Sequence, residues 1–144
     1  MKQLDYHCSI TTNVTPKEAI KGISRVADWW AKNFEGNAKN LNDIFTIRFG
    51  ETYVTFKITE MIADSKVVWL VTDCYLHWLK DKTEWSNTKV VWELSAKNNS
   101  TEINFTHVGL LPQVECYDNC VKGWDQYVKG SLQKLLDENK GLPD

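Results

Sequence analysis

The sequence predicts an α+β fold in which a curved antiparallel sheet of about six or seven strands wraps around one long C-terminal helix. The first observation is a run of five segments between residues 44 and 109 that are rich in β-branched and aromatic residues and separated by short turns. The second is a change of apolar spacing after Pro112, from a period of two to a period of about 3.6. Each element then has one apolar face, so we expect the sheet and the helix to pack together.

The individual elements follow from local signals along the chain. Residues 4–14 alternate between apolar and polar side chains, which predicts a half-buried strand. Thr15, Pro16 and Glu18 then supply a helix cap, a proline at the first helical position and a glutamate at the third. Gly22 divides the following segment, so two short helices are expected. A short strand over 34–40 precedes the five main strands, which are predicted over 44–49, 51–62, 66–76, 89–97 and 101–109.

Length and charge limit the classes of function. A chain of 144 residues fits a single domain over 1–144. Seventeen basic against nineteen acidic residues give a net charge of -2, which disfavours nucleic acid as a partner. The longest uninterrupted apolar run covers residues 67–71, and residues 1–5 do not resemble a signal peptide, so we expect a cytoplasmic protein with no membrane partner.

The four cysteines are expected to be reduced thiols, because a domain of this size needs no cross-links and no secretory signal accompanies them. Cys116 and Cys120 lie four residues apart on nearly one side of the long helix. Zinc would require four ligands, and no second cysteine pair or histidine pair stands at ligand spacing. We therefore expect packing rather than a metal site or a disulfide, and no metal or cofactor.

Alternation along the strands predicts which side chains face the helix, once Lys57, Glu93 and Glu102 are assumed to face water. The inward set is Phe45, Ile47, Phe49, Val54, Phe56, Ile58, Val67, Trp69, Val71, Asp73, Tyr75, Val90, Trp92, Leu94, Ile103, Phe105 and His107. Trp69 and Trp92 project with Trp124 of the long helix into one interior. Such a stripe is either an ordinary core or the wall of a cavity, since a long helix over a bent sheet leaves space that large rings can line.

Seven segments of the chain carry a further signal: Thr15-Pro16-Lys17-Glu18-Ala19, Trp29-Trp30, Ile58-Thr59-Glu60-Met61, Lys66-Val67-Val68-Trp69, Phe105-Thr106-His107-Val108-Gly109-Leu110, Gly123-Trp124-Asp125-Gln126-Tyr127 and Ser131-Leu132. Together they resemble the SRPBCC superfamily, in particular the branch that contains the C-terminal domain of the activator of the heat-shock-protein-ninety ATPase. The resemblance covers nearly the whole chain. It implies a helix-grip fold, shared with START domains, birch-pollen-type allergens and aromatase/cyclases, whose cavity often holds an apolar small molecule.

The resemblance does not imply one activity, because members of the superfamily include lipid carriers, polyketide cyclases, hydroxylase subunits and co-chaperone domains. The eukaryotic co-chaperone carries an additional N-terminal domain that a chain of 144 residues lacks. We therefore do not expect this chain to stimulate a chaperone ATPase.

Three functions stay open: a small-molecule binding module, a cyclase- or dehydratase-like enzyme and a chaperone-related adaptor. The binding module would hold an apolar or aromatic ligand between the sheet and the long helix. Its expected ligand-binding residues are Trp69, Tyr75, Trp92, Phe105, His107, Cys120, Trp124 and Tyr127. The sequence does not supply the ligand's identity, the pathway or a choice between monomer and homodimer.

His107 is the main polar candidate. The enzyme would use His107 with Asp73 or Tyr75 for proton transfer. A single inward histidine is more often a satisfied core group, so no catalytic residue is assigned. The polar segment 79–88 is interpreted as a surface loop, with a lid over the cavity as the alternative.

Overall fold

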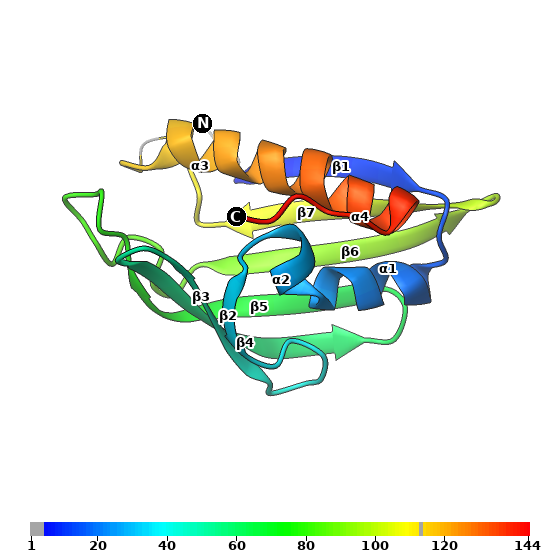
Figure 1. Cartoon of the computed structure of the whole chain (residues 1–144), viewed down its shortest axis with the longest axis horizontal. Coiled ribbons are helices and arrows are strands. Elements are labelled where there is room, and N and C mark those ends of the chain that lie inside the picture. The colour runs from blue at the N-terminus through cyan, green and yellow to red at the C-terminus, as the bar shows by residue number, and fades with distance from the viewer. Residues whose placement is uncertain (1–4, 113) are drawn as a thin grey trace.

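Seven strands form one antiparallel sheet in the computed structural model, which describes residues 5–112 and 114–144 (Figure 1). The strand order across the sheet is β1-β7-β6-β5-β4-β3-β2, and the long C-terminal helix lies across one face. This arrangement confirms the predicted α+β helix-grip architecture. The strands are β1 (Tyr6–Thr12), β2 (Asn33–Gly36), β3 (Ile44–Phe49), β4 (Thr52–Ile62), β5 (Lys66–Tyr75), β6 (Lys89–Lys97) and β7 (Ser100–Val108).

Two short helices follow β1, as predicted: α1 (Pro16–Ser24) and α2 (Val26–Trp29). The Thr15 hydroxyl accepts a hydrogen bond of 3.2 Å from the Glu18 N–H, which is the expected helix cap. The break between the helices falls at Arg25 and not at Gly22. Gly22 instead allows close packing, because a Cβ there would overlap the Leu136 side chain of the long helix. The start of the predicted first strand, at residue 4, lies outside the described residues, as do residues 1–3 of the segment compared with a signal peptide.

The long helix is continuous from residue 117 to residue 138 but is not regular. Its first part, α3 (Tyr117–Trp124), and its last part, α4 (Gln133–Glu138), are α-helical. Between them, η1 (Asp125–Leu132) has the wider winding of a π-helix. The helix ends at Asn139, which adopts a left-handed conformation with φ of 57°. The following residues fold back beneath the helix, where the Asp144 N–H donates to the Trp30 carbonyl at 3.0 Å.

The core between sheet and helix is filled largely by aromatic rings. Trp69 packs edge-on against Trp92 with ring centroids 5.4 Å apart, and Trp92 packs against Phe105 at 4.8 Å. The predicted inward positions of β3, β4, β6 and β7 are buried or half-buried, as are those of β5 up to Val71. The aromatic stripe therefore serves first as a core.

The last part of β5 differs from the prediction, because Asp73 and Tyr75 do not face the helix. Phe56 of β4 pairs with Val71, whereas the preceding Thr55 pairs with Asp73, so that one residue of β5 is extra at this point. This β-bulge inverts the alternation beyond it and turns Cys74 inward instead. On the outer face, the Tyr53 hydroxyl donates to the Asp73 carboxylate at 3.1 Å.

Candidate functional site

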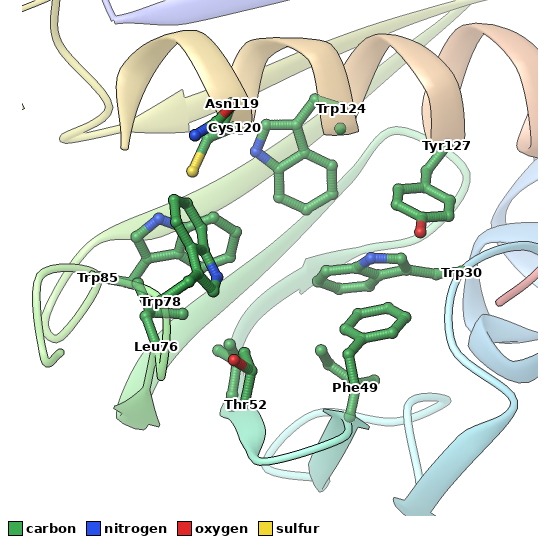
Figure 2. A pocket seen from close by; sticks show the side chains of 13 residues that line it. Trp30, Phe49, Thr52, Leu76, Trp78, Trp85, Asn119, Cys120, Trp124 and Tyr127 are labelled. Atoms are coloured by element: carbon green, nitrogen blue, oxygen red, sulfur yellow. The ribbon is translucent and has the colours of Figure 1, made fainter. Parts of the chain in front are cut away.

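An aromatic pocket of about 140 Å³ lies between the start of the long helix and one end of the sheet (Figure 2). Residues from β3, β4, the turn after α2, the segment after β5, α3 and η1 surround it, and none of them is charged. Its lining residues are Trp30, Ile47, Phe49, Thr52, Val54, Leu76, Trp78, Trp85, Asn119, Cys120, Gly123, Trp124 and Tyr127.

Trp124 is the central ring of the pocket, and Figure 2 shows it projecting from the helix between the other tryptophans. Its centroid lies 4.9 Å from that of Trp30, the residue that follows α2. On the other side it stacks on Trp85 at 5.7 Å, with an interplanar angle of 14°. Trp78 is 49% exposed, unlike the other three tryptophans, which are buried. The pocket thus has a buried aromatic wall and, at Trp78, a half-exposed aromatic side chain.

His107 fixes the orientation of Trp124 from behind. The Trp124 indole N–H donates to His107 Nδ1 at 3.1 Å. An indole nitrogen can only donate, so the imidazole proton must sit on Nε2, which lies 2.9 Å from the Thr88 hydroxyl. That hydroxyl in turn donates to the Trp85 carbonyl at 2.6 Å. His107 is fully buried, and this desolvation lowers its pKa from 6.5 to about 3, so the ring stays neutral.

The residues expected to bind a ligand separate into two groups. Cys120, Trp124 and Tyr127 line the aromatic pocket. The other five do not line it: Trp69, Trp92 and Phe105 are fully buried in the core, His107 lies behind Trp124, and Tyr75 lies on the outer face of the sheet. The indole nitrogens of the two core tryptophans have no hydrogen-bond partner within the described part of the chain.

Sequence reasoning did not assign Trp30, Phe49, Trp78 and Trp85 to the site, although all four line the pocket. The signal for the last two was available, because large apolar residues stand out in an otherwise polar connection. Trp30 belongs to the Trp29-Trp30 pair already noted in the sequence. Its place in the pocket depends on the turn after α2, which the sequence did not define.

The connection from residue 77 to residue 88 is bonded to the start of the long helix. The Glu84 carboxylate accepts from the N–H groups of Glu115 at 2.6 Å and Cys116 at 3.1 Å. The Glu115 carboxylate accepts in return from the N–H groups of Lys80 at 3.0 Å and Asp81 at 3.1 Å. These backbone hydrogen bonds hold the pKa of Glu115 below its usual range. We call this reciprocal arrangement the glutamate clamp; it holds Trp85 against the helix.

A disulfide joins Cys116 and Cys120, which corrects the expectation that both are reduced and packed as small apolar residues. The expectation placed both cysteines inside one helix, but Cys116 is the capping residue that precedes α3. The resulting Cα–Cα distance of 5.6 Å is within the usual range for a disulfide. The Trp85 indole N–H donates to Cys116 Sγ at 3.3 Å. Cys8 and Cys74 are free thiols, as expected, and both are buried, although the predicted alternation of β5 had placed Cys74 on the outer face.

Comparison with known sequences gives little information about function. No protein-family model matches the chain. A curated protein of Picrophilus torridus described as a deoxyhypusine synthase is 32% identical over 95 residues, which cover 65% of this chain. The match covers only 29% of that protein, so it does not place the chain in that family.

Comparison with solved structures establishes the fold. The Aha1 dimer from Colwellia psychrerythraea has a TM-score of 0.75 at 19% identity, covering 98% of this chain and 100% of that chain. A Mesorhizobium loti protein has a TM-score of 0.72 at 13% identity, covering 94% and 99% of the two chains. A Bacillus halodurans protein has a TM-score of 0.70 at 16% identity, covering 95% and 100%. All three are under 25% identical to this chain, so these similarities establish its fold and not its activity.

The described helices include none that is both long enough and apolar enough to span a bilayer.

Proposed function

We propose that this chain binds a compact, planar and largely apolar small molecule in the aromatic pocket. The observation that carries the proposal is the convergence of four tryptophans from three separate segments on open space: Trp30, Trp78, Trp85 and Trp124. Trp78 is half exposed, so part of the apolar lining is open to solvent, and contact with an apolar molecule would remove that area from water. Concave, mostly apolar sites with a few polar groups are typical of small-molecule binding.

The volume and the lining indicate the class of ligand. A volume of about 140 Å³ is close to the ~150 Å³ of an engineered cavity that binds benzene. It is below the roughly 300 to 1,000 Å³ of sites for drug-sized ligands. No lining residue carries a charge, so a charged group would lose its hydration without gaining a partner. The proposed ligand is therefore neutral, with one or two rings, and Thr52 and Asn119 are positioned to bind a polar substituent.

The geometry favours binding over catalysis at this site. His107 uses both ring nitrogens within the protein, to Trp124 and Thr88, and its pKa is lowered to about 3. Asp73 and Tyr75, the partners that an enzyme of the cyclase kind would need, lie on the outer face beyond the bulge. Acid–base catalysis requires titratable groups that converge on the substrate, and the lining of the pocket supplies no such pair.

A homodimer is the assembly that we propose to accompany this function. The similar Colwellia psychrerythraea protein is a dimer, and its chain is matched over its full length. Sedimentation velocity over a range of protein concentrations tests this part of the proposal. A single species with the mass of one chain at all concentrations would refute it.

Titration with indole, followed by the amide signals of ¹⁵N-labelled protein, tests the binding proposal. Indole has nine heavy atoms, and at about 0.6 kcal/mol per atom we expect a Kd on the order of 0.1 mM. The matched variants are Gly123→Leu and Gly130→Leu on the same helix. A Cβ at either glycine meets no atom within 4 Å, but only Gly123 lines the pocket.

We expect Gly123→Leu to fill the pocket and weaken indole binding at least about tenfold, a loss of roughly 1.4 kcal/mol. Gly130→Leu should bind like the wild type, because the added side chain lies outside the pocket. Equal affinity in all three proteins would show that indole binds elsewhere and would contradict the proposal.

A further inference from the structure

We propose that the Cys116–Cys120 disulfide is redox-active and that a thiol reductant reaches it through the aromatic pocket, so that occupancy of the pocket controls its reduction. The natural occupant in this scheme is the ligand of the proposed function, and the regulatory role rests on that function. The route of access depends only on how the chain surrounds the two sulfur atoms.

The two sulfurs differ in accessibility. Cys116 is fully buried, and Trp85 covers it with an indole N–H 3.3 Å from the sulfur. Cys120 is 7% exposed and lines the aromatic pocket. Figure 2 shows Cys120 beside Asn119 and Trp124. Thiol–disulfide exchange requires direct contact between the attacking thiolate and one sulfur. Among the described residues, the approach to this disulfide is therefore through the pocket to Cys120.

Exchange with a dithiol then proceeds in two balanced steps. A reductant thiolate attacks Cys120 Sγ, the Cys116–Cys120 bond breaks, and Cys116 leaves with the electron pair as a thiolate. The second thiolate of the reductant then attacks the reductant's first sulfur, which is bonded to Cys120 in the mixed disulfide. Cys120 leaves as a thiolate. The reductant becomes a cyclic disulfide, the protein gains two electrons, and its two thiolates take up two protons.

The surroundings of Cys116 suit a leaving thiolate. The residue caps the N-terminus of α3, where the partial positive charge of the helix end favours an anion. The indole N–H of Trp85 already points at the sulfur and can donate to the thiolate. The Glu84 carboxylate opposes this effect, since it accepts from the Cys116 N–H at 3.1 Å. Two hydrogen bonds from backbone N–H groups offset part of that charge.

The test compares reduction rates under dithiothreitol in three proteins: the wild type, Gly123→Leu and Gly130→Leu. Timed alkylation and mass spectrometry report the appearance of thiols at Cys116 and Cys120, separately from the buried thiols of Cys8 and Cys74. Because the larger side chain in Gly123→Leu would fill the approach to Cys120, we expect reduction about tenfold slower in that variant. Gly130→Leu should be reduced at the wild-type rate.

Removing the exposed side chain at the rim gives the opposite expectation. Trp78→Ala should fold, since this residue is about half exposed, and it widens the approach to the pocket. We expect its disulfide to be reduced roughly threefold faster or more. This variant keeps the inference open to refutation even when Gly123→Leu fails to fold. Equal rates in the wild type, Gly123→Leu and Trp78→Ala, or a wild-type chain with all four cysteines reduced under oxidising conditions, would overturn the inference.

Saturating indole separates this inference from the binding proposal. Slower reduction of the wild type in the presence of indole supports both. When indole has no effect but Gly123→Leu still slows reduction, the access route stands and the proposed ligand class is wrong. When neither indole nor Gly123→Leu slows reduction, the access route itself is refuted.

Discussion

At the level of single residues, His107 supports the aromatic pocket and does not serve as a reacting group. Its neutral ring accepts from Trp124 and donates to Thr88, whose hydroxyl reaches the Trp85 carbonyl. One buried imidazole therefore positions two stacked tryptophans that line the pocket. A histidine in this role must stay uncharged, since protonation of Nδ1 would place two donors against each other.

The stability of the fold should depend on pH through this residue. Burial lowers the pKa of His107 to about 3 in the folded chain from 6.5 in the unfolded chain, so below pH 6.5 only the unfolded chain takes up the proton. The stabilisation is complete above pH 6.5 and is lost as pH falls toward 3. Between pH 6.5 and 4.5 we expect the wild type to lose about 2 to 3 kcal/mol more than His107→Gln, as measured by urea unfolding. Identical pH dependence in the two proteins would contradict this role.

The sequence predicted that His107 faces inward but not which residues surround it. Alternation along β7 was sufficient for the first point. Predicting the residues around His107 would have required knowledge of the bulge in β5, which moves Asp73 and Tyr75 to the outer face. That bulge has no local signature in the sequence. Burial of Trp85 was also missed, because its contacts come from residues 22 and 39 positions further along the chain.

At the level of elements, the glutamate clamp joins the start of α3 to the connection after β5, two segments between which the sequence predicted no contact. Glu84 binds the backbone at the start of α3, and Glu115 binds the backbone of the connection after β5. This arrangement holds Trp85 and the Cys116–Cys120 pair at the pocket, together with the stacking of Trp85 on Trp124. The sequence predicted the helix from its apolar spacing, but a cap supplied by a residue 32 positions earlier cannot be read from a local pattern.

Glu84→Ala should loosen this junction. It removes the charged acceptor of two backbone N–H groups, at an expected cost of about 1 to 2 kcal/mol in the free energy of unfolding. Hydrogen exchange should become faster at the amides of Glu115 and Cys116. Glu138→Ala, at the other end of the helix, is the control, because its carboxylate is exposed and its ion pair within the described part of the chain is a long one, to Lys134 at 3.9 Å. A similar change in stability in both variants would argue against the clamp.

At the scale of the whole molecule, the long helix and all seven strands enclose one continuous aromatic core. The hydrophobic cluster includes residues from β1 to α4, and no described segment has a core of its own. The sequence predicted this architecture well, since periodicity and turn residues determine antiparallel neighbours and burial drives the helix onto the sheet. It did not predict how far the rings fill the interior, because packing volume depends on all side chains together.

A single shared core leads us to expect one cooperative unfolding transition. Tryptophan fluorescence and far-ultraviolet circular dichroism should give the same midpoint and the same free energy of unfolding in urea, as for a two-state domain. The experiment should be done without reductant, so that the disulfide stays intact. Two separate midpoints would contradict a single domain over residues 1–144.

The central claim is that a small molecule binds in the aromatic pocket. Intermolecular nuclear Overhauser effects from bound indole test it most directly. We expect contacts from indole protons to the ring protons of Trp30, Trp124 and Tyr127, which surround the aromatic pocket. The stacked pair Tyr53 and Tyr75 on the outer face provides an internal comparison, since it also offers partly exposed aromatic surface. Contacts to that pair, with none to Trp124, would contradict the account.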